Sequence, residues 1–202
     1  MEKTNNIKRL LNEIYIKIKN LINKEIKINL LHDIVKFKNI TTKIIQLKKS
    51  ATSQVYKDIN NTIVIKKIIK YQDYNVFERE IHILKLLNNK NINIPELLYY
   101  DIKNQIIIMS YCGIPINKQV FKSNNNYKKQ LSNIIKELKK LNIKHNDIKH
   151  NSEILLLNNI IYLCDFGWAT VNDNLHCDIN LSNKPKPAGI INDDIFLYSF
   201  NK

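Results

Sequence analysis

Two aspartates, Asp147 and Asp165, each lie in a short polar turn beside an apolar run, in the stretch "KHNDIKHNSEILLLNNIIYLCDFGWAT". Carboxylates in such turns can take up a proton or hold a metal ion. Taken alone, each is also what a turn or the end of a strand commonly contains. Lys149 comes two residues after Asp147, and Gly167, one of only three glycines in the chain, comes two residues after Asp165. The joint pattern favours a functional site over two unrelated turns.

The elements before these aspartates are predicted from the spacing of apolar residues. An amphipathic helix is expected just before His145, because one helical stripe holds Tyr127, Leu131, Ile134, Ile135, Leu138 and Leu141. The runs "EILLLNN" and "IIYLCDF" predict a hairpin that turns at Asn158-Asn159 and ends at Asp165. We therefore expect one aspartate after a helix and the other at the end of a hairpin.

Further upstream, short β-rich runs predict an antiparallel sheet. Three of them, "KIIQLKK", "SQVYKDI" and "NTIVIKKII", are separated by polar turns. A helix follows in "YNVFEREIHILKLLNN", which places Phe77, Ile81, Leu84 and Leu87 on one face. Two more strands, "ELLYYDI" and "QIIIMSY", are joined by a turn at "KN". The order of elements predicts an α+β fold with five antiparallel strands and one helix packed on them.

Composition limits the class of protein. With 202 residues, 44% of them hydrophobic, the chain can build one core or two small lobes, and a disordered chain is not expected. The formal net charge of +14 raises nucleic acid as a partner, but the lysines are spread along the chain among Ile and Asn. Such a distribution favours a solvated surface. Residues 5–35 carry apolar residues at spacings of three and four, which predicts one or two further amphipathic helices.

The cysteines and the apolar runs bear on location. Cys112, Cys164 and Cys177 lack the spacing of metal ligands, and the first residues contain no uninterrupted apolar signal region. Every apolar run is interrupted by charges or Asn before the roughly 18 residues that a membrane span needs. We expect an intracellular, cytoplasmic protein with free thiols and no membrane span.

Two motifs resemble those of the protein kinase superfamily. "HNDIK" is similar to the catalytic-loop His-Arg-Asp-x-Lys, and "DFG" at 165–167 is the metal-binding triplet of that family, 18 residues after Asp147. The resemblance implies a two-lobe fold in which Asp147 faces the acceptor hydroxyl and Asp165 holds Mg²⁺ with ATP. It also implies that Lys149 lies against the transferred phosphoryl group, as in serine/threonine-directed kinases. Gly167 is expected to let the backbone turn sharply after the metal ligand.

The same resemblance implies a nucleotide site upstream. "TIVIKKII" is similar to the Val-Ala-Ile-Lys strand, which makes Lys66 the phosphate-anchoring lysine, with Lys67 as an alternative on the other face. Glu80 matches the helix glutamate that pairs with that lysine, although a solvated helix carboxylate would give the same pattern. The remaining residues implied around the nucleotide are Ser53, Val55, Val64, Met109 at the back of the adenine pocket, and the backbone from Ser110 through Tyr111 to Cys112.

The chain departs from the family pattern in three places. The phosphate-covering loop contains no glycine, and its turn consists of the small residues Ser50, Ala51, Thr52 and Ser53. The expected metal-binding asparagine falls on Ser152, flanked by Asn151 and Glu153, so the candidate metal ligands are Asp165, Ser152 and Asn151. Asn146 replaces the arginine before Asp147, so activation through a phosphorylated loop held by that arginine is not expected.

The apolar spacing predicts an N-terminal helical extension over 1–40. The resemblance, which covers roughly residues 41–200, implies an N-lobe over 41–112 and an abbreviated C-lobe over 113–202, with Asp193 or Asp194 anchoring its last helix. The leading hypothesis is ATP-dependent phosphoryl transfer to serine or threonine of a protein. A small-molecule or sugar kinase of the same superfamily is the second hypothesis. A pseudokinase that binds or scaffolds without turnover is the third, and a nucleic-acid-binding protein is disfavoured. ATP and Mg²⁺ are the expected cofactors.

Overall fold

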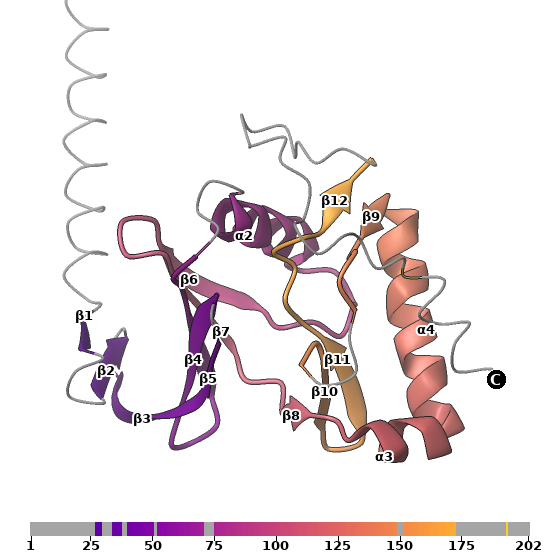
Figure 1. The fold of residues 1–202 in the computed structure, drawn as a ribbon, viewed down its shortest axis with the longest axis horizontal. Coiled ribbons are helices and arrows are strands. Elements are labelled where there is room, and N and C mark those ends of the chain that lie inside the picture. The colour runs from indigo at the N-terminus through magenta and orange to yellow at the C-terminus, as the bar shows by residue number, and fades with distance from the viewer. Residues whose placement is uncertain are drawn as a thin grey trace, which may run out of the picture. The chain divides into compact units, whose positions relative to one another are not determined.

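The fold was taken from a computed structural model, which describes residues 27–29, 34–37, 40–50, 52–70, 75–148, 152–172 and 193 (Figure 1). The described residues combine helices with antiparallel strands, which confirms the α+β class. The chain divides into two units, Met1–Ile45 with Asp58–Asn60 and Gln46–Lys57 with Asn61–Lys202. This division runs through the first long strand, and the predicted lobe boundary at 112/113 stays a prediction. No helix in the described part of the chain is long and apolar enough to cross a membrane.

The first unit holds a small antiparallel meander. Its strands are β1 (Lys27–Asn29), β2 (Ile34–Phe37) and the start of β3 (Ile40–Lys49). Ile28 pairs with Val35, and Ile34 pairs with Lys43. The helix predicted over 5–35 is therefore wrong at 27–29 and at 34–35, because pairing with neighbouring strands overrides a weak apolar period. The rest of that prediction lies outside the described residues.

The second unit contains the predicted five-stranded antiparallel sheet. It consists of the end of β3, then β4 (Ser53–Asp58), β5 (Ile63–Ile68), β6 (Leu97–Asp101) and β7 (Ile106–Ser110), in the order β3-β4-β5-β7-β6. The pairs β4–β5, β5–β7 and β6–β7 are antiparallel. This order places β5 in the interior of the sheet, where its side chains are flanked on both sides.

The helix that follows β5 is α2 (Val76–Leu87). It buries the predicted face, including Phe77, Leu84 and Leu87, in a core shared with Ile107 and Met109 of β7. Glu78 in the first turn and Lys85 in the last turn match the helix dipole. Glu80 lies on the same buried side of α2, so the helix carries a carboxylate into the interior.

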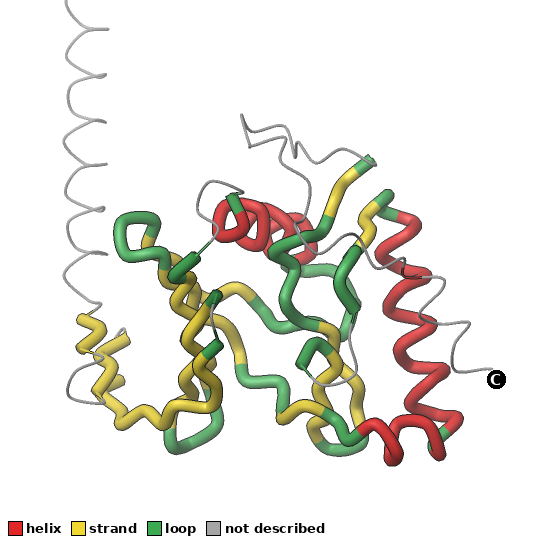
Figure 2. Tube along the Cα trace, in the orientation of Figure 1, coloured by secondary structure: helices red, strands yellow, loops and turns green. Residues whose placement is uncertain are grey.

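After β7 the chain forms β8 (Ile114–Pro115), α3 (Lys118–Ser123) and α4 (Asn125–Lys140) (Figure 2). The helix α4 buries the predicted stripe except for Leu141, which follows its last residue and is exposed; α3 was not predicted. Asn117 and Asn124 cap the two helices, and each side-chain oxygen accepts hydrogen bonds from two backbone N–H groups of the first turn. These caps explain why a polar stretch forms two successive helices.

The last described strands are β9 (Ile143–Lys144), β10 (Ile154–Leu157), β11 (Ile160–Leu163) and β12 (Thr170–Val171). The strands β10 and β11 form the predicted hairpin, and both turn residues, Asn158 and Asn159, have positive φ values of 50° and 64°. The strand β10 also pairs with β8, and β12 pairs with β9 (Figure 1). The β9–β12 pair brings the two segments that carry Asp147 and Asp165 together.

Candidate active site

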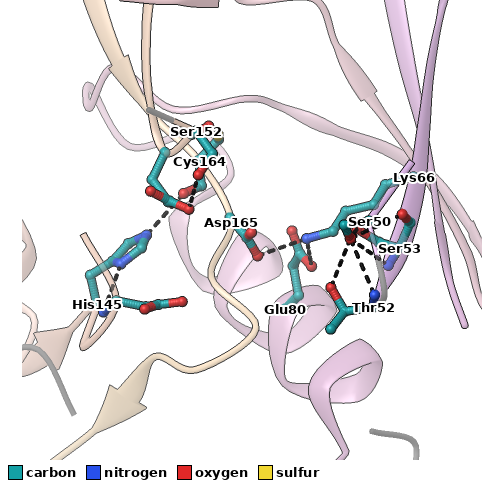
Figure 3. A network of polar contacts seen from close by, with 11 residues as sticks. Ser50, Thr52, Ser53, Lys66, Glu80, His145, Ser152, Cys164 and Asp165 are labelled. Carbon is teal, nitrogen blue, oxygen red and sulfur yellow. Dashed lines mark hydrogen bonds and ion pairs between the residues drawn. The ribbon is translucent and has the colours of Figure 1, made fainter. Parts of the chain in front are cut away.

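Lys66 lies at the centre of the candidate site. It is buried on β5, and its Nζ lies 2.6 Å from Glu80 Oε2 of α2 and 2.8 Å from Asp165 Oδ1 (Figure 3). Lys67, the alternative, is only half-buried on the opposite face of the strand. The structure thus brings together three of the predicted site residues from three different elements.

The pKa values of Lys66 and Glu80 depend on burial and on the other charges of the triad. Burial alone would lower the pKa of Lys66, but the carboxylates of Asp165 and then Glu80 raise it above its ordinary value. Burial raises the pKa of Glu80, and Asp165 adds to that rise while Lys66 opposes it. We take charged Lys66 as the dominant state, because it has two carboxylate partners whereas they share one ammonium. The side chain of Asp165 is 41% exposed, so a cation from solvent can reach this carboxylate.

The segment from Cys164 to Gly167 holds Asp165 in an unusual conformation. Asp165 has a φ of 71°, a left-handed value that costs energy in a residue with a Cβ. Phe166 beside it is fully buried and lies edge-on to the His145 ring, with 4.9 Å between ring centroids. The neighbours of Asp165 are fixed by packing, which keeps its carboxylate directed at Lys66.

Gly167 lies in the predicted turn and also allows a close contact. The Ala169 N–H donates to the Phe166 carbonyl oxygen at 3.0 Å, which closes a turn that contains Gly167. A Cβ at Gly167 would lie 2.5 Å from Cγ1 of Val76, the first residue of α2. Glycine is therefore required here for the close approach of the segment to α2, while the positive φ in this segment belongs to Asp165.

The loop from His145 to Asp147 is fixed by a distant carboxylate. The backbone N–H groups of His145 and Asn146 donate to the two oxygens of Asp193, at 2.8 and 3.0 Å. Asp193 was one of the two predicted anchors; the other, Asp194, lies outside the described residues. The link holds the loop next to Asp147, which is itself buried.

The protonation of His145 follows from its partners. Its Nδ1 lies 3.3 Å from the backbone N of Asp147, which can only donate, so this nitrogen accepts. Its Nε2 lies 2.9 Å from the Cys164 carbonyl oxygen and therefore carries the proton. Burial lowers the pKa of His145, in agreement with a neutral ring. His145 thus connects the Asp147 loop to the residue before Asp165.

A cavity of about 270 Å³ opens onto the triad. Ten predicted residues line it: Ser53, Val55, Val64, Lys66, Glu80, Met109, Ser110, Cys112, Ser152 and Asp165. Further lining residues that sequence reasoning missed are Leu47, Lys48, Pro95, Ile114, Leu155 and Cys164, most of them on strands next to predicted site residues. Its volume is close to the lower end, about 300 Å³, of ligand pockets.

Four predicted residues are not part of that lining. Tyr111 and Asp147 do not line the cavity, and Lys149 and Asn151 lie outside the described residues. The backbone N–H of Tyr111 donates to the Thr62 carbonyl oxygen at 3.0 Å. The backbone N–H of Ser110 donates to the Glu96 carbonyl oxygen, also at 3.0 Å, so neither of these two amides is available to a ligand edge.

The glycine-free turn before β4 is closed by its own hydroxyl groups. Ser50 Oγ accepts hydrogen bonds from the backbone N–H groups of Thr52 and Ser53, at 3.2 and 3.0 Å. The same hydroxyl donates to the Ser53 carbonyl oxygen at 3.2 Å. In a glycine-rich loop such amides bind phosphate oxygens; here Ser50 already takes up two of them.

The residues present fit Mg²⁺ bound together with a nucleotide. Asp165 and Ser152 both line the cavity, and both supply oxygen, the ligand type that Mg²⁺ prefers. Ser152 Oγ also donates to the carboxylate of Glu153. No group of three or more His, Cys, Asp or Glu gathers among the described residues as a complete metal cage. Such sparse protein ligation is usual where phosphates supply the remaining oxygens.

Comparison with known proteins gives distant relatives. No family model matches the chain. An Aurora kinase of Saccharomyces cerevisiae is 31% identical over 117 residues, covering 52% of this chain and 31% of the relative. An Aurora kinase of Eremothecium gossypii is 30% identical over 117 residues, with the same coverage. The chain spans about a third of the length of these two curated relatives.

A third relative belongs to a different kind of protein. It is a probable bifunctional tRNA threonylcarbamoyladenosine biosynthesis protein of Methanocaldococcus jannaschii, 25% identical over 137 residues, covering 62% of this chain and 25% of the relative. The α+β fold, with its antiparallel sheet and following helix, agrees with the similarity to the two kinases. These distant similarities support membership of the protein kinase superfamily, as a divergent member.

Proposed function

We propose that this chain is an ATP-dependent phosphotransferase that acts on a hydroxyl group. The observation that carries the proposal is the contact of Lys66 with Glu80 and Asp165 at the wall of one cavity. A buried lysine held between carboxylates is an expensive arrangement for stability alone. Phosphoryl transfer needs this arrangement, because a cation must be fixed beside the phosphates of the nucleotide.

Each charged residue has a separate role in this proposal. Lys66 binds the phosphates, and Glu80 holds the Lys66 side chain in place. Asp165 and Ser152 would hold Mg²⁺, which neutralises the charge of the β- and γ-phosphates when it is bound. Asp147 accepts the proton of the acceptor hydroxyl as its oxygen bonds to the γ-phosphorus, while the bond from that phosphorus to the β-phosphate oxygen breaks and ADP leaves.

Serine or threonine of a protein is the proposed acceptor. This part of the proposal rests on Lys149, which matches the lysine of serine/threonine-directed kinases. A small molecule or a sugar that carries an aliphatic hydroxyl group satisfies the same chemistry. An acceptor panel that contains both classes therefore decides between them.

The test uses γ-labelled ATP with Mg²⁺, a panel of generic proteins and small hydroxyl compounds, and three forms of the chain. We expect label transfer by the native chain. Asp147→Asn should bind ATP with Mg²⁺ normally in calorimetry but transfer roughly a hundredfold to a thousandfold more slowly. Asp165→Asn should lose the Mg²⁺-dependent part of ATP binding, because an amide cannot neutralise the metal charge. Equal effects of both substitutions on binding would contradict the assigned roles.

A pseudokinase is the second candidate, and specific observations favour it. The amides of Thr52 and Ser53 bind Ser50, and Ser152 stands where the resemblance implies asparagine. Both features weaken phosphate and metal binding without affecting the fold. If the native chain binds ATP but transfers no more label than Asp147→Asn, the pseudokinase is the better conclusion.

A further inference from the structure

Asn146, the residue before Asp147, joins two segments through its side chain. Its Nδ2 donates to the Trp168 carbonyl oxygen at 3.1 Å and to Thr170 Oγ1 at 3.0 Å. Both acceptors belong to the stretch that follows Asp165, and Thr170 begins β12. One buried amide nitrogen thus links the catalytic loop to the segment after the metal-binding motif.

The conformation of Asn146 is adapted to this contact. Its φ of 64° is left-handed, a region that Asn tolerates better than most residues with a Cβ. Its backbone N–H donates to Asp193, so backbone and side chain bind different partners. Removing the side chain would leave the Asp193 bond intact, and the two contacts can therefore be tested separately.

The segment after Asp165 is held here by a strand pair and by an aromatic contact, in which the buried Arg79 guanidinium lies 5.9 Å from the centroid of the Trp168 ring. Thr170 pairs with Lys144, and Val171 pairs with Ile143, in the β9–β12 ladder beside Asn146. Thr170 is only 4% exposed, so its hydroxyl is not accessible to a modifying enzyme. The carboxamide of Asn146 carries no charge and makes these bonds without a phosphate group.

We propose that Asn146 is a positioning residue that fixes the segment after Asp165 against the catalytic loop. The proposal rests on the proposed phosphotransfer. Asn146 acts through the placement of Asp147 relative to Asp165 and does not touch the reacting atoms. Its loss should therefore slow transfer while nucleotide affinity is retained.

The test compares Asn146→Gly, Asn146→Asp and Thr170→Val with the native chain, all shown by mass spectrometry to carry no phosphate. Glycine tolerates the positive φ, and aspartate keeps the shape of the side chain but replaces the donor by an acceptor. Asn89→Gly is the matched control, because Asn89 also has a positive φ of 65° but is exposed and distant in sequence from the site. Circular dichroism confirms the fold of each variant.

We expect the unphosphorylated native chain to transfer label, and Asn146→Gly and Asn146→Asp to lower kcat roughly tenfold while the Kd for ATP with Mg²⁺ changes less than about twofold. Thr170→Val should show a smaller loss, because the Trp168 acceptor remains, and Asn89→Gly should show none. A kcat of Asn146→Gly within twofold of native would overturn the proposal.

Hydrogen exchange separates this proposal from the proposed function. In Asn146→Gly, we expect the amides of Trp168–Val171 to exchange roughly tenfold faster, with Asn89→Gly unchanged. This result does not depend on activity. If the native chain transfers no label but the exchange difference is present, phosphotransfer fails and the structural contact of Asn146 is retained. Unchanged exchange in Asn146→Gly and Asn146→Asp overturns the positioning role itself.

Discussion

The turn from Ser50 to Ser53 and the loop from His145 to Asp147 are both short polar connections, but they are held in different ways. The side-chain bonds of the first are made among its own residues, and only backbone groups near the end of β5, the N–H groups of Ile69 and Lys70, bind it from outside, at the Thr52 carbonyl oxygen. The second is held by distant ones, through Asp193, Cys164 and the segment that contains Trp168 and Thr170. We therefore expect substitutions in the turn to leave the fold intact, whereas substitutions in the loop should disturb it.

This difference separates the charged residues of the site from the turn at Ser50–Ser53. The carboxylates and Lys66 have fixed positions that depend on the core, and the fully buried Phe166 and the nearly buried Glu80 are part of that core. The turn instead presents hydroxyl groups and amides that already have partners. We expect substitutions on the fixed side to lower stability and activity together, and substitutions in the turn to affect nucleotide affinity alone.

The largest effect on stability is expected for Lys66→Met. Methionine removes the ammonium group that pairs with the buried Glu80, and breaking one side of a buried ion pair costs about 3 kcal/mol. Denaturant unfolding should show this loss. The double variant Lys66→Met with Glu80→Gln should recover part of it, because no buried charge remains. Equal stabilities of the native chain and Lys66→Met would mean that the ion pair does not fix the site.

Gly167→Ala should have the next largest effect. The added Cβ would lie 2.5 Å from Val76 Cγ1, and overpacking of this kind costs about 1 to 3 kcal/mol. The shift would move the start of α2 and, with it, Glu80. Adding Val76→Ala should restore part of the loss, because it removes the clashing methyl group. Strictly additive free energies of unfolding for the two substitutions would show that this contact is not the cause.

A smaller, pH-dependent effect is expected from His145. Burial lowers its pKa below the ordinary 6.5, so the unfolded chain binds a proton in a range where the folded chain does not. Stability is therefore complete above about pH 6.5 and is lost as the pH falls, by at most about 1.4 kcal/mol per pH unit. Denaturant unfolding at pH 7 and pH 5.5 should show a smaller loss in His145→Gln. Parallel losses in both proteins would assign the pH dependence to other groups.

Local patterns predicted much of the sheet, and the resemblance to kinase motifs singled out the triad. Alternation along β5 set Lys67 on the face opposite Lys66, the motif match chose Glu80, and the two asparagines 158 and 159 marked the hairpin. The sheet and the hairpin could be predicted because each depends on residues that are close together in the chain. The strands at 27–29 and 34–37 were missed because isoleucines spaced by three and four also fit a helix, and only pairing decides between the two.

Contacts between distant residues were harder to predict. The bonds from Asp193 to residues 145 and 146 span nearly 50 positions, and the local sequence offered Asp194 equally well. The close approach of Gly167 to Val76 also depends on how two elements pack. Asparagine favours helix starts, so Asn117 and Asn124 could have indicated the beginnings of α3 and α4. Asparagine is so frequent in this chain that a single one does not locate a helix start.

The smallest effect on stability, and the sharpest test of the comparison, is expected for Ser50→Ala. Without the hydroxyl, the amides of Thr52 and Ser53 become available to phosphate oxygens, so ATP with Mg²⁺ should bind about two- to fivefold more tightly, which corresponds to one weak hydrogen bond. Adenosine, which has no phosphates, should bind unchanged, and the loss in stability should stay below about 1 kcal/mol. Thr52→Val is the control, because it removes a neighbouring hydroxyl but leaves Ser50 bound to both amides. Calorimetry with the two ligands measures the difference. Weaker ATP binding by Ser50→Ala, with adenosine unchanged, would mean that the Ser50 hydroxyl itself binds phosphate, and the turn would then be a fixed part of the site like the loop around Asp147.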